Sequence, residues 1–342
     1  DNDTELLFKS KSTSPVNGNV SKDGSAYNIN TTGDLLRLSV LFNTEGEFGT
    51  EAFDGITYAD ALKGEYHLTN TLYDLTSTGF VSMQRNRGKG DTLTNNASDG
   101  VYFTGKFIGT AAEKSVIKQK TELHRQPYMG FFIYLGDNAD NVTEIANIDM
   151  EQEINQTSVY GMYYYNVAYI GGFATFAKGS INVNNMTVSL NSSTVYCSAG
   201  DKGCIGGLFG RYVPVGNSVL NVKDLNASGD KSLYDRDNIT GQVIGYVDSP
   251  NGYKPILKFE NIDISGNVEN KRNGEQASGA TGFIGVINNL NYNLWDNKGN
   301  LNVRTVLNIK NINLHDLNIK TASTTNRSAG LLGLAWTDVD TE

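Results

Sequence analysis

The acidic residues best placed for chemistry occur as close pairs in two segments, Asp137 with Asp140 and Asp235 with Asp237. Two carboxylates about 5 to 10 Å apart can act as acid and base on a glycosidic bond. Oxygen-rich loops also bind Ca²⁺, although neither segment has the spacing of a defined calcium loop. Both segments are typical of turns, so a weak Ca²⁺ site is the most that either predicts, and no other cofactor is expected.

The three histidines, His67, His124 and His315, are far apart and carry no recognisable motif. The sequence contains no His-x-x-x-His pair, no serine nucleophile elbow and no phosphate-binding Gly-Lys-Ser loop. His315 is expected in an exposed turn and His124 in a solvated loop. We therefore predict no catalytic residue and no metal site.

Two cysteines, Cys197 and Cys204, bracket the short segment Ser-Ala-Gly-Asp-Lys-Gly. Cysteines that close a short loop in a chain of extracellular character are more often a disulfide than a site. We predict that they form a disulfide that mainly immobilises this loop, with free thiols as the alternative.

Aromatic residues are concentrated in two segments that interrupt the regular pattern of the chain. Exposed rings can stack on sugars or anchor a protein partner, although such rings can equally seal a loop against a sheet. The candidate ligand-binding residues are Tyr163, Tyr164 and Tyr165, in a cluster that begins at Tyr160, and Tyr292 and Trp295 in a long insertion.

The elements that would position these side chains repeat along the C-terminal two-thirds of the chain. Five times, a polar residue interrupts a run of alternating apolar residues, with apolar residues two before it, one after it and three after it. These residues are Asn147, Asn185, Asp224, Asn261 and Asn311, at spacings of 38, 39, 37 and 50. Such a recurrence indicates a repeat architecture. Asn and Asp tolerate left-handed backbone geometry, so we predict that the five form a structural corner whose stacked side chains are hydrogen-bonded in a ladder.

Glycine-bracketed apolar runs alternate with these corners. They occupy residues 129–135, 170–176, 205–212, 241–247, 279–287 and 328–336. Each unit is interpreted as one Gly-rich strand followed by two short strands that meet at the polar corner. Stacking of such units predicts an all-β fold, a right-handed parallel β-helix, because each coil buries its apolar row only against its neighbours. A β-sandwich with many short strands is the alternative.

The first part of the chain fits this repeat poorly. Strands are predicted at 35–42 and 101–108, with one or two helical turns at 58–63. Open β-helices need a covered first coil, so residues 1–115 are interpreted as an N-terminal cap with irregular first coils, and residues 116–342 as the regular coils. A separate binding domain is the alternative for the N-terminal part. The last Gly-rich run lies close to Glu342, so we expect the segment to stop in mid-repeat and to belong to a longer polypeptide.

Charge and hydropathy narrow the classes of partner. The 342 residues include 28 basic and 37 acidic ones, a net charge of −9, and no cluster of Lys or Arg stands out, so nucleic acid is not expected as a partner. No stretch of 18 apolar residues occurs, so insertion of this segment into a membrane is not expected. The polar first residues do not resemble a signal peptide and suggest a mature or excised fragment.

A three-strand coil with an Asn corner resembles the pectin-lyase-like β-helix of many polysaccharide lyases and hydrolases. That resemblance implies carboxylates with a Lys or Arg on the outer face of one sheet, but no residue here matches an enzyme motif. The pieces GGLFG, GFIG and GLLG, each followed by an Asn-rich strand pair, are more similar to the repeats of large β-helical surface adhesins of bacteria.

The resemblance to adhesins implies a non-enzymatic segment at the bacterial cell surface. Its loops would bind a glycan or protein on a host or microbial surface, since binding residues tend to lie on loops held by a rigid scaffold. The alternatives are a polysaccharide-active β-helix enzyme and a purely structural stalk or surface-layer component.

Overall fold

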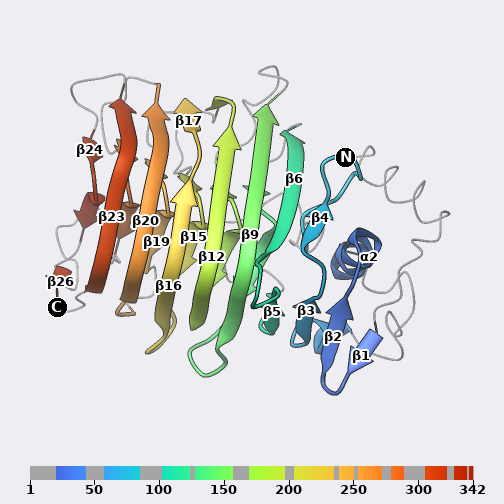
Figure 1. Ribbon diagram of the computed structural model, residues 1–342. Helices are drawn as coiled ribbons and strands as arrows, with labels where there is room; N and C mark the ends of the chain where they lie inside the picture. Colours follow the sequence, from blue (N-terminus) through green and yellow to red (C-terminus); the bar gives the residue numbers. More distant parts are fainter. Residues whose placement is uncertain are drawn as a thin grey trace.

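The computed structural model describes residues 21–43, 58–84, 102–123, 128–156, 169–196, 204–234, 239–249, 253–271, 279–288, 305–321, 327–336 and 339–341. In these residues the chain winds into a parallel β-helix of about five turns (Figure 1). The prediction of an all-β solenoid is confirmed.

Three parallel sheets form the walls of the β-helix over the described residues, and each coil contributes one strand to each sheet in turn. The first short sheet contains β7 (Tyr128–Met129), β10 (Tyr169–Gly171), β14 (Cys204–Gly206), β18 (Ile239–Gly241), β21 (Gly279–Thr281) and β24 (Arg327–Ala329). The second short sheet contains β8 (Phe132–Gly136), β11 (Ala174–Lys178), β15 (Phe209–Val213), β19 (Ile244–Asp248), β22 (Ile284–Asn288) and β25 (Leu332–Trp336).

The long sheet completes each coil. Its coil strands are β9 (Thr143–Gln156), β12 (Ile181–Ser192), β16 (Val219–Ser228), β20 (Ile256–Asn270) and β23 (Thr305–Thr321), joined at the margins by β13 (Val195–Tyr196), β17 (Lys231–Tyr234) and β26 (Val339–Thr341). Towards the N-terminus the sheet continues through β6 (Ser115–Leu123), β5 (Lys106–Ile108), β4 (Leu72–Asp74), β3 (Glu65–Leu68), β2 (Ala26–Ile29) and β1 (Ser21–Asp23).

The strand assignment within each unit differs from the sequence interpretation. Each Gly-rich run forms two strands, one in each short sheet, because a sharp turn divides it. Glycine is needed in this turn, since a Cβ atom at Gly172 would lie 2.1 Å from the carbonyl oxygen of Gly207 in the next coil. The two strands predicted to meet at the corner are instead one long strand, whose pairing continues on both sides of Asn185.

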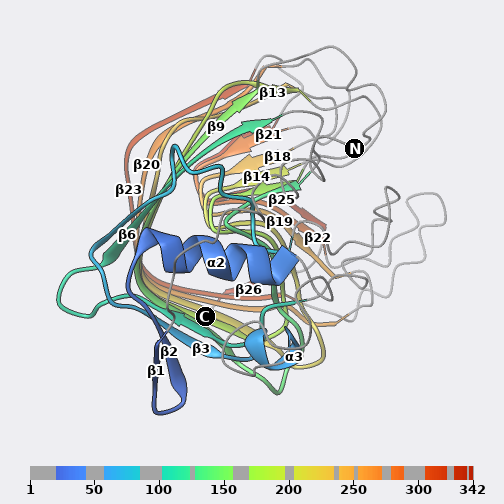
Figure 2. The same ribbon diagram turned by 90° about the vertical axis from the view of Figure 1, so that its right-hand side faces the viewer.

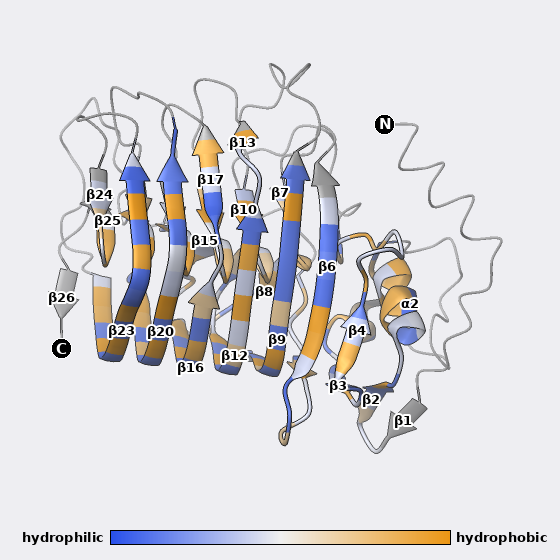
Figure 3. Ribbon diagram, turned by 45° about the horizontal axis from the view of Figure 1, so that its top comes forward, coloured by the Kyte–Doolittle hydropathy of each residue, from blue (hydrophilic) through white to orange (hydrophobic). Residues whose placement is uncertain are grey.

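The core contains the apolar side chains on the inward face of each long strand. Hydrophobic and hydrophilic residues alternate along β9, β12, β16, β20 and β23 (Figure 3). Ile145, Val183, Val222 and Phe259 are stacked in successive coils and are buried. The short sheets close this core from the other side with residues such as Phe132 of β8 and Phe209 of β15.

The strand predicted at 35–42 is wrong: these residues belong to the helix α2 (Thr32–Asn43). The Thr31 hydroxyl accepts from the Asp34 amide at 3.1 Å, and the Asp34 carboxylate accepts from the Thr31 amide at 2.9 Å, which is a capping box. Leu35, Leu38 and Phe42 then fall on one helical face and are fully buried.

This helix closes the N-terminal end of the β-helix. Figure 2 shows α2 lying across the end of the coils, and its apolar face joins the same core cluster as they do. Two polar side chains tie it to the segment at 81–82: the Ser39 hydroxyl donates to the carbonyl of Val81, and the Asn43 amide donates to that of Ser82 at 3.0 Å.

The other N-terminal predictions have mixed outcomes. The helical turns predicted at 58–63 are confirmed by α3 (Tyr58–Ala61). The strand predicted at 101–108 is shorter, because only Lys106–Ile108 pairs as a strand while Phe103 makes an isolated bridge with Leu135. The division of the chain at residue 115 stays a prediction. No helix in the described residues is long and apolar enough to cross a membrane.

Candidate functional site

The outer face of the long sheet is an ordered polar surface formed by the described coil strands. Inward residues are committed to the core, so every second residue of β9, β12, β16, β20 and β23 points away from it. Parallel pairing places equivalent outward residues of neighbouring strands side by side. This face divides into three parts with different chemistry.

The first part is an acidic and basic patch on β6 and β9. Asp149, Glu151 and Glu153 alternate along β9 and therefore share its outer face. Lys118 Nζ lies 3.1 Å from Glu151, and Lys120 Nζ lies 3.0 Å from Glu153. These residues are not among the sequence-predicted candidates, although the pattern Asp-x-Glu-x-Glu predicts three carboxylates on one face of a strand.

Asp149 differs from the two glutamates of this patch. Burial raises the pKa of Asp149, the charge of Glu151 adds to that effect, and Lys114 and Lys118 oppose it. The amine of Lys114 donates to the hydroxyl of Thr187, on strand β12, at 2.9 Å. A carboxyl with a raised pKa next to a second carboxyl on the same face is an arrangement that acid and base pairs use.

The second part is a strip of uncharged side chains on the two middle coil strands. We call it the amide strip, comprising Asn182, Asn184, Thr187 and Ser189 of β12 and Asn221, Asn226 and Ser228 of β16. Asn221 and Asn182 are joined across the strands by an amide contact of 3.4 Å. The charged outward residues on these two strands are Lys223 and, in the corner, Asp224. Rigid neighbouring strands thus present amide and hydroxyl groups at about 4.8 Å intervals along the β-helix.

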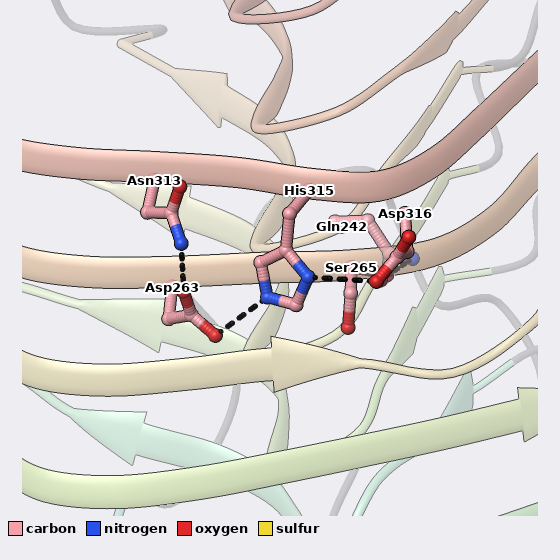
Figure 4. A network of polar contacts seen from close by, with 6 residues as sticks. All are labelled: Gln242, Asp263, Ser265, Asn313, His315 and Asp316. Carbon is pink, nitrogen blue, oxygen red and sulfur yellow. Dashed lines mark hydrogen bonds and ion pairs between the residues drawn. The ribbon is translucent and has the colours of Figure 1, made fainter.

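The third part is a histidine with two carboxylates on β20 and β23 (Figure 4). Here β23 contains one more residue than β20 opposite it, which is a β-bulge, and Asp316 has a φ of 47°. The His315 ring lies with Nε2 2.9 Å from Asp263 and Nδ1 3.1 Å from Asp316. Asn313 donates to the other oxygen of Asp263 at 2.7 Å.

Both ring nitrogens of His315 are occupied by acceptors, so the imidazolium form fits this site. The hydrogen bonds to Asp263 and then to Asp316 raise the pKa of His315. Partial burial acts to raise the pKa of Asp263, but hydrogen bonds from His315 and Asn313 outweigh it and hold this pKa below its usual range. With no free ring nitrogen, His315 connects strands β20 and β23 and is not arranged as a general base.

The corner residues form a hydrogen-bonded row at one margin of this face. All five have positive φ, between 50° and 57°. Asn185 donates to Asn147 at 2.8 Å, Asn261 to Asp224 at 2.7 Å and Asn311 to Asn261 at 2.9 Å. The row is interrupted between Asp224 and Asn185, because an ionised carboxylate has no proton to donate.

The short sheets carry a second, aromatic cluster on the side away from the main core. Tyr134 stacks on Phe176 with ring centroids 5.5 Å apart, and Arg211 follows Phe176 in the same row. Arg211 forms a buried ion pair with Asp248 and lies over the Tyr169 ring at 5.6 Å. No local sequence pattern indicates this pair, because the two residues are 37 positions apart.

The disulfide predicted between Cys197 and Cys204 stays a prediction, because only Cys204 lies in the described residues. Cys204 is fully buried, and its thiol donates to the Gly210 carbonyl at 2.9 Å. The side chain of Cys204 faces the aromatic cluster, where burial raises the pKa of its thiol.

Several sequence-predicted candidates cannot be placed. Outside the described residues lie Tyr160, Tyr163, Tyr164, Tyr165, Tyr292, Trp295, His124, Asp235 and Asp237. The segment from Asp137 to Asp140 is described and is a turn, in which Asn138 accepts from the Asp140 amide at 3.0 Å and Asp137 lies 3.4 Å from Lys178. In the described part of the chain, no group of three His, Cys, Asp or Glu residues could hold a metal ion.

No protein-family model matches this chain, and no curated protein or solved structure is significantly similar to it.

Proposed function

We propose that this chain is a non-enzymatic binding segment of a bacterial surface adhesin, in which the β-helix is a rigid scaffold for recognition of a polar polymer. The observation that carries the proposal is the amide strip on β12 and β16. Its side chains can both donate and accept hydrogen bonds, as recognition of sugar hydroxyls or of a peptide backbone requires. They stand on paired strands, so little conformational freedom is lost on binding.

The neighbouring parts of the face favour the amide strip as the contact surface. The glutamates of β9 are already paired with lysines of β6, and Asp263 of β20 is occupied by His315 and Asn313. Asn184 and Asn226 are exposed and have hydrogen-bonding capacity to offer to a ligand. A ligand is thus expected to lie across the middle coils.

A glycan array and a peptide array probed with the folded protein test this function. We expect retention of one polymer class without cleavage, and a loss of about tenfold or more in affinity when Asn184→Ala and Asn226→Ala are combined. Lys320→Ala, on the outward side of β23, is the matched control and should bind like the wild type. Binding that is unaffected by the double substitution would remove the amide strip from the proposal, and absence of binding would favour a structural stalk.

One observation favours a second candidate function, polysaccharide hydrolysis at Asp149 and Glu151. Burial raises the pKa of Asp149, as a general acid requires, and Glu151, which lies 3.1 Å from Lys118 Nζ, is the candidate base. The Cα atoms of residues two apart on a strand are separated by about 6.6 Å, so parallel side chains on one face would hold their carboxyl groups near the separation of inverting hydrolases. Release of reducing ends by the wild type, abolished by Asp149→Asn, would establish this activity in place of simple binding.

A further inference from the structure

The sharp turn between the two short sheets has one exceptional residue. In the described coils from β10 onward, this turn position is occupied by Gly172, Gly207, Gly282 and Gly330. The coil of β18 has Gln242 there instead, and its side chain is fully buried. Glycine permits close approach of neighbouring coils, so a glutamine at this position indicates that its side chain has a specific partner.

The partner is Lys231, the first residue of β17. Its side chain is buried in the core, in a column that continues as Val268 and Ile319 in the next two coils. Lys231 Nζ contacts Oε1 of Gln242 and donates to the Ser228 carbonyl at 3.0 Å. No carboxylate contacts this amine among the residues that the structure describes.

The amide nitrogen of Gln242 is held equally firmly. Nε2 donates to the Gly229 carbonyl at 2.8 Å and to the Ser265 carbonyl at 2.7 Å. Gly229 has a φ of 98°, and Gly266, which follows Ser265, has a φ of 102°, so the backbone is not extended at either acceptor. The carboxamide is therefore fixed in one orientation, with its carbonyl towards the lysine.

We propose that Lys231 and Gln242 are a modification site at which the folded chain forms an intramolecular isopeptide bond. The uncharged amine of Lys231 attacks Cδ of Gln242, one bond away from the oxygen that it already contacts. A new Nζ–Cδ bond forms and the Cδ–Nε2 bond breaks. One proton moves from Nζ to Nε2, which leaves as ammonia, and the product is a neutral secondary amide.

Three features of the site favour this reaction. Burial lowers the pKa of Lys231 to about 7, against the opposing charge of Asp230, so a large share of the nucleophile is unprotonated at neutral pH. Fixed geometry replaces a bimolecular encounter, which is worth effective concentrations of about 10⁵ to 10⁸ M in well-oriented reactions. The product also removes an ionisable amine from an apolar core, where burying its charged form is costly.

The mass of the intact protein tests the proposal directly. After incubation of the folded wild type at mildly alkaline pH, we expect a mass lower by one ammonia molecule. A protease digest should then contain a branched peptide that joins the segments around Lys231 and Gln242. A full, unmodified mass after prolonged incubation would overturn the proposal.

Substitutions identify the source of any lost ammonia. Lys231→Met and Gln242→Met remove one reactant each and should both keep the full mass, whether or not they fold. Lys258→Met, on the exposed side of β20, is the matched control and should lose ammonia like the wild type. Loss of ammonia that persists in Lys231→Met comes from another reaction, such as cyclisation at an asparagine, and would equally overturn the proposal.

Discussion

Apolar side chains that face the core are buried to different extents at the two ends of the β-helix. At the N-terminal end, α2 covers the first coils and its residues Leu38 and Phe42 are fully buried (Figure 2). At the other end, Ile312 and Leu314 of β23 are only partly buried, whereas their counterparts Ile262 and Ile264 in β20 are 1% and 0% exposed.

One residue of β23, Leu307, is buried and shows why burial differs between the ends. Leu307 is 7% exposed, and it lies in the short part of β23 that is paired with β26. An inward residue of a solenoid is therefore buried by the next coil as much as by its own. The same apolar side chain contributes less where no neighbour is stacked on it, and four predictions test this difference.

The largest effect is expected at the covered end. Phe42→Ala should lower the free energy of unfolding by about 3 to 5 kcal/mol, because it removes a buried ring and leaves a cavity between α2 and the coils. Urea unfolding followed by circular dichroism measures the change. Leu72→Ala, at a leucine that is 45% exposed, is the control and should cost about 0.5 kcal/mol or less.

A matched pair of isoleucines compares the interior with the open end. Ile262→Ala should cost about 2 to 5 kcal/mol, since its side chain is fully enclosed by neighbouring coils. Ile312→Ala, at the paired position one coil later, should cost clearly less in the same urea titration. Equal costs would show that burial by the next coil does not decide the contribution.

Substitution of a corner residue should lower the stability of the protein less than substitution of a buried core residue. Asn261→Ala places a Cβ-bearing residue without a polar side chain at a φ of 56°, which should cost about 1 to 2 kcal/mol. Asn261→Gly tolerates this backbone geometry, so it should lose only a part of that amount. Asn184→Ala on the neighbouring outward surface is the control, and thermal melts rank the three variants.

The smallest effect is expected from the histidine on the outer face of β23. Its pKa is raised above the ordinary value of 6.5 on folding, so its stabilising contribution is complete below that pH and is lost as pH rises through the folded pKa. The urea midpoint of the wild type should therefore fall relative to His315→Gln above about pH 6.5. Parallel pH dependence of the two proteins would contradict this assignment.

The repeat could be predicted because its signals are local. Alternation of apolar residues around Asn185 or Asn261 shows which side chains face inward, and an Asn or Asp there suits a left-handed corner. The helix α2 was also predictable: Thr31 and Asp34 have capping-box spacing, and Leu35, Leu38 and Phe42 follow a helical period. Unless the capping-box spacing and the helical period are checked, a short apolar run fits a strand as well as a helix.

The sites of interest could not be predicted in the same way. Arg211 and Asp248 are 37 residues apart, and His315 and Asp263 are 52 residues apart. Their contacts depend on how one coil is aligned with the next. The connections between strands differ in length, so spacing in the sequence does not show which residues are aligned. The split of each Gly-rich run into two strands likewise depends on close approach between coils, as at Gly172 and Gly207.

The sequence by itself thus determined the repeat, the inward row and the corner residues, because hydrophobic periodicity and backbone preference act over a few neighbouring positions. Only the tertiary structure decided which residues of successive coils meet. It placed Lys231 against Gln242, aligned the amide strip and buried Ile262 more completely than Ile312. The physical reason is that the register between coils is set by contacts between residues of neighbouring coils. Those residues are far apart in the sequence, so no local pattern predicts which of them meet.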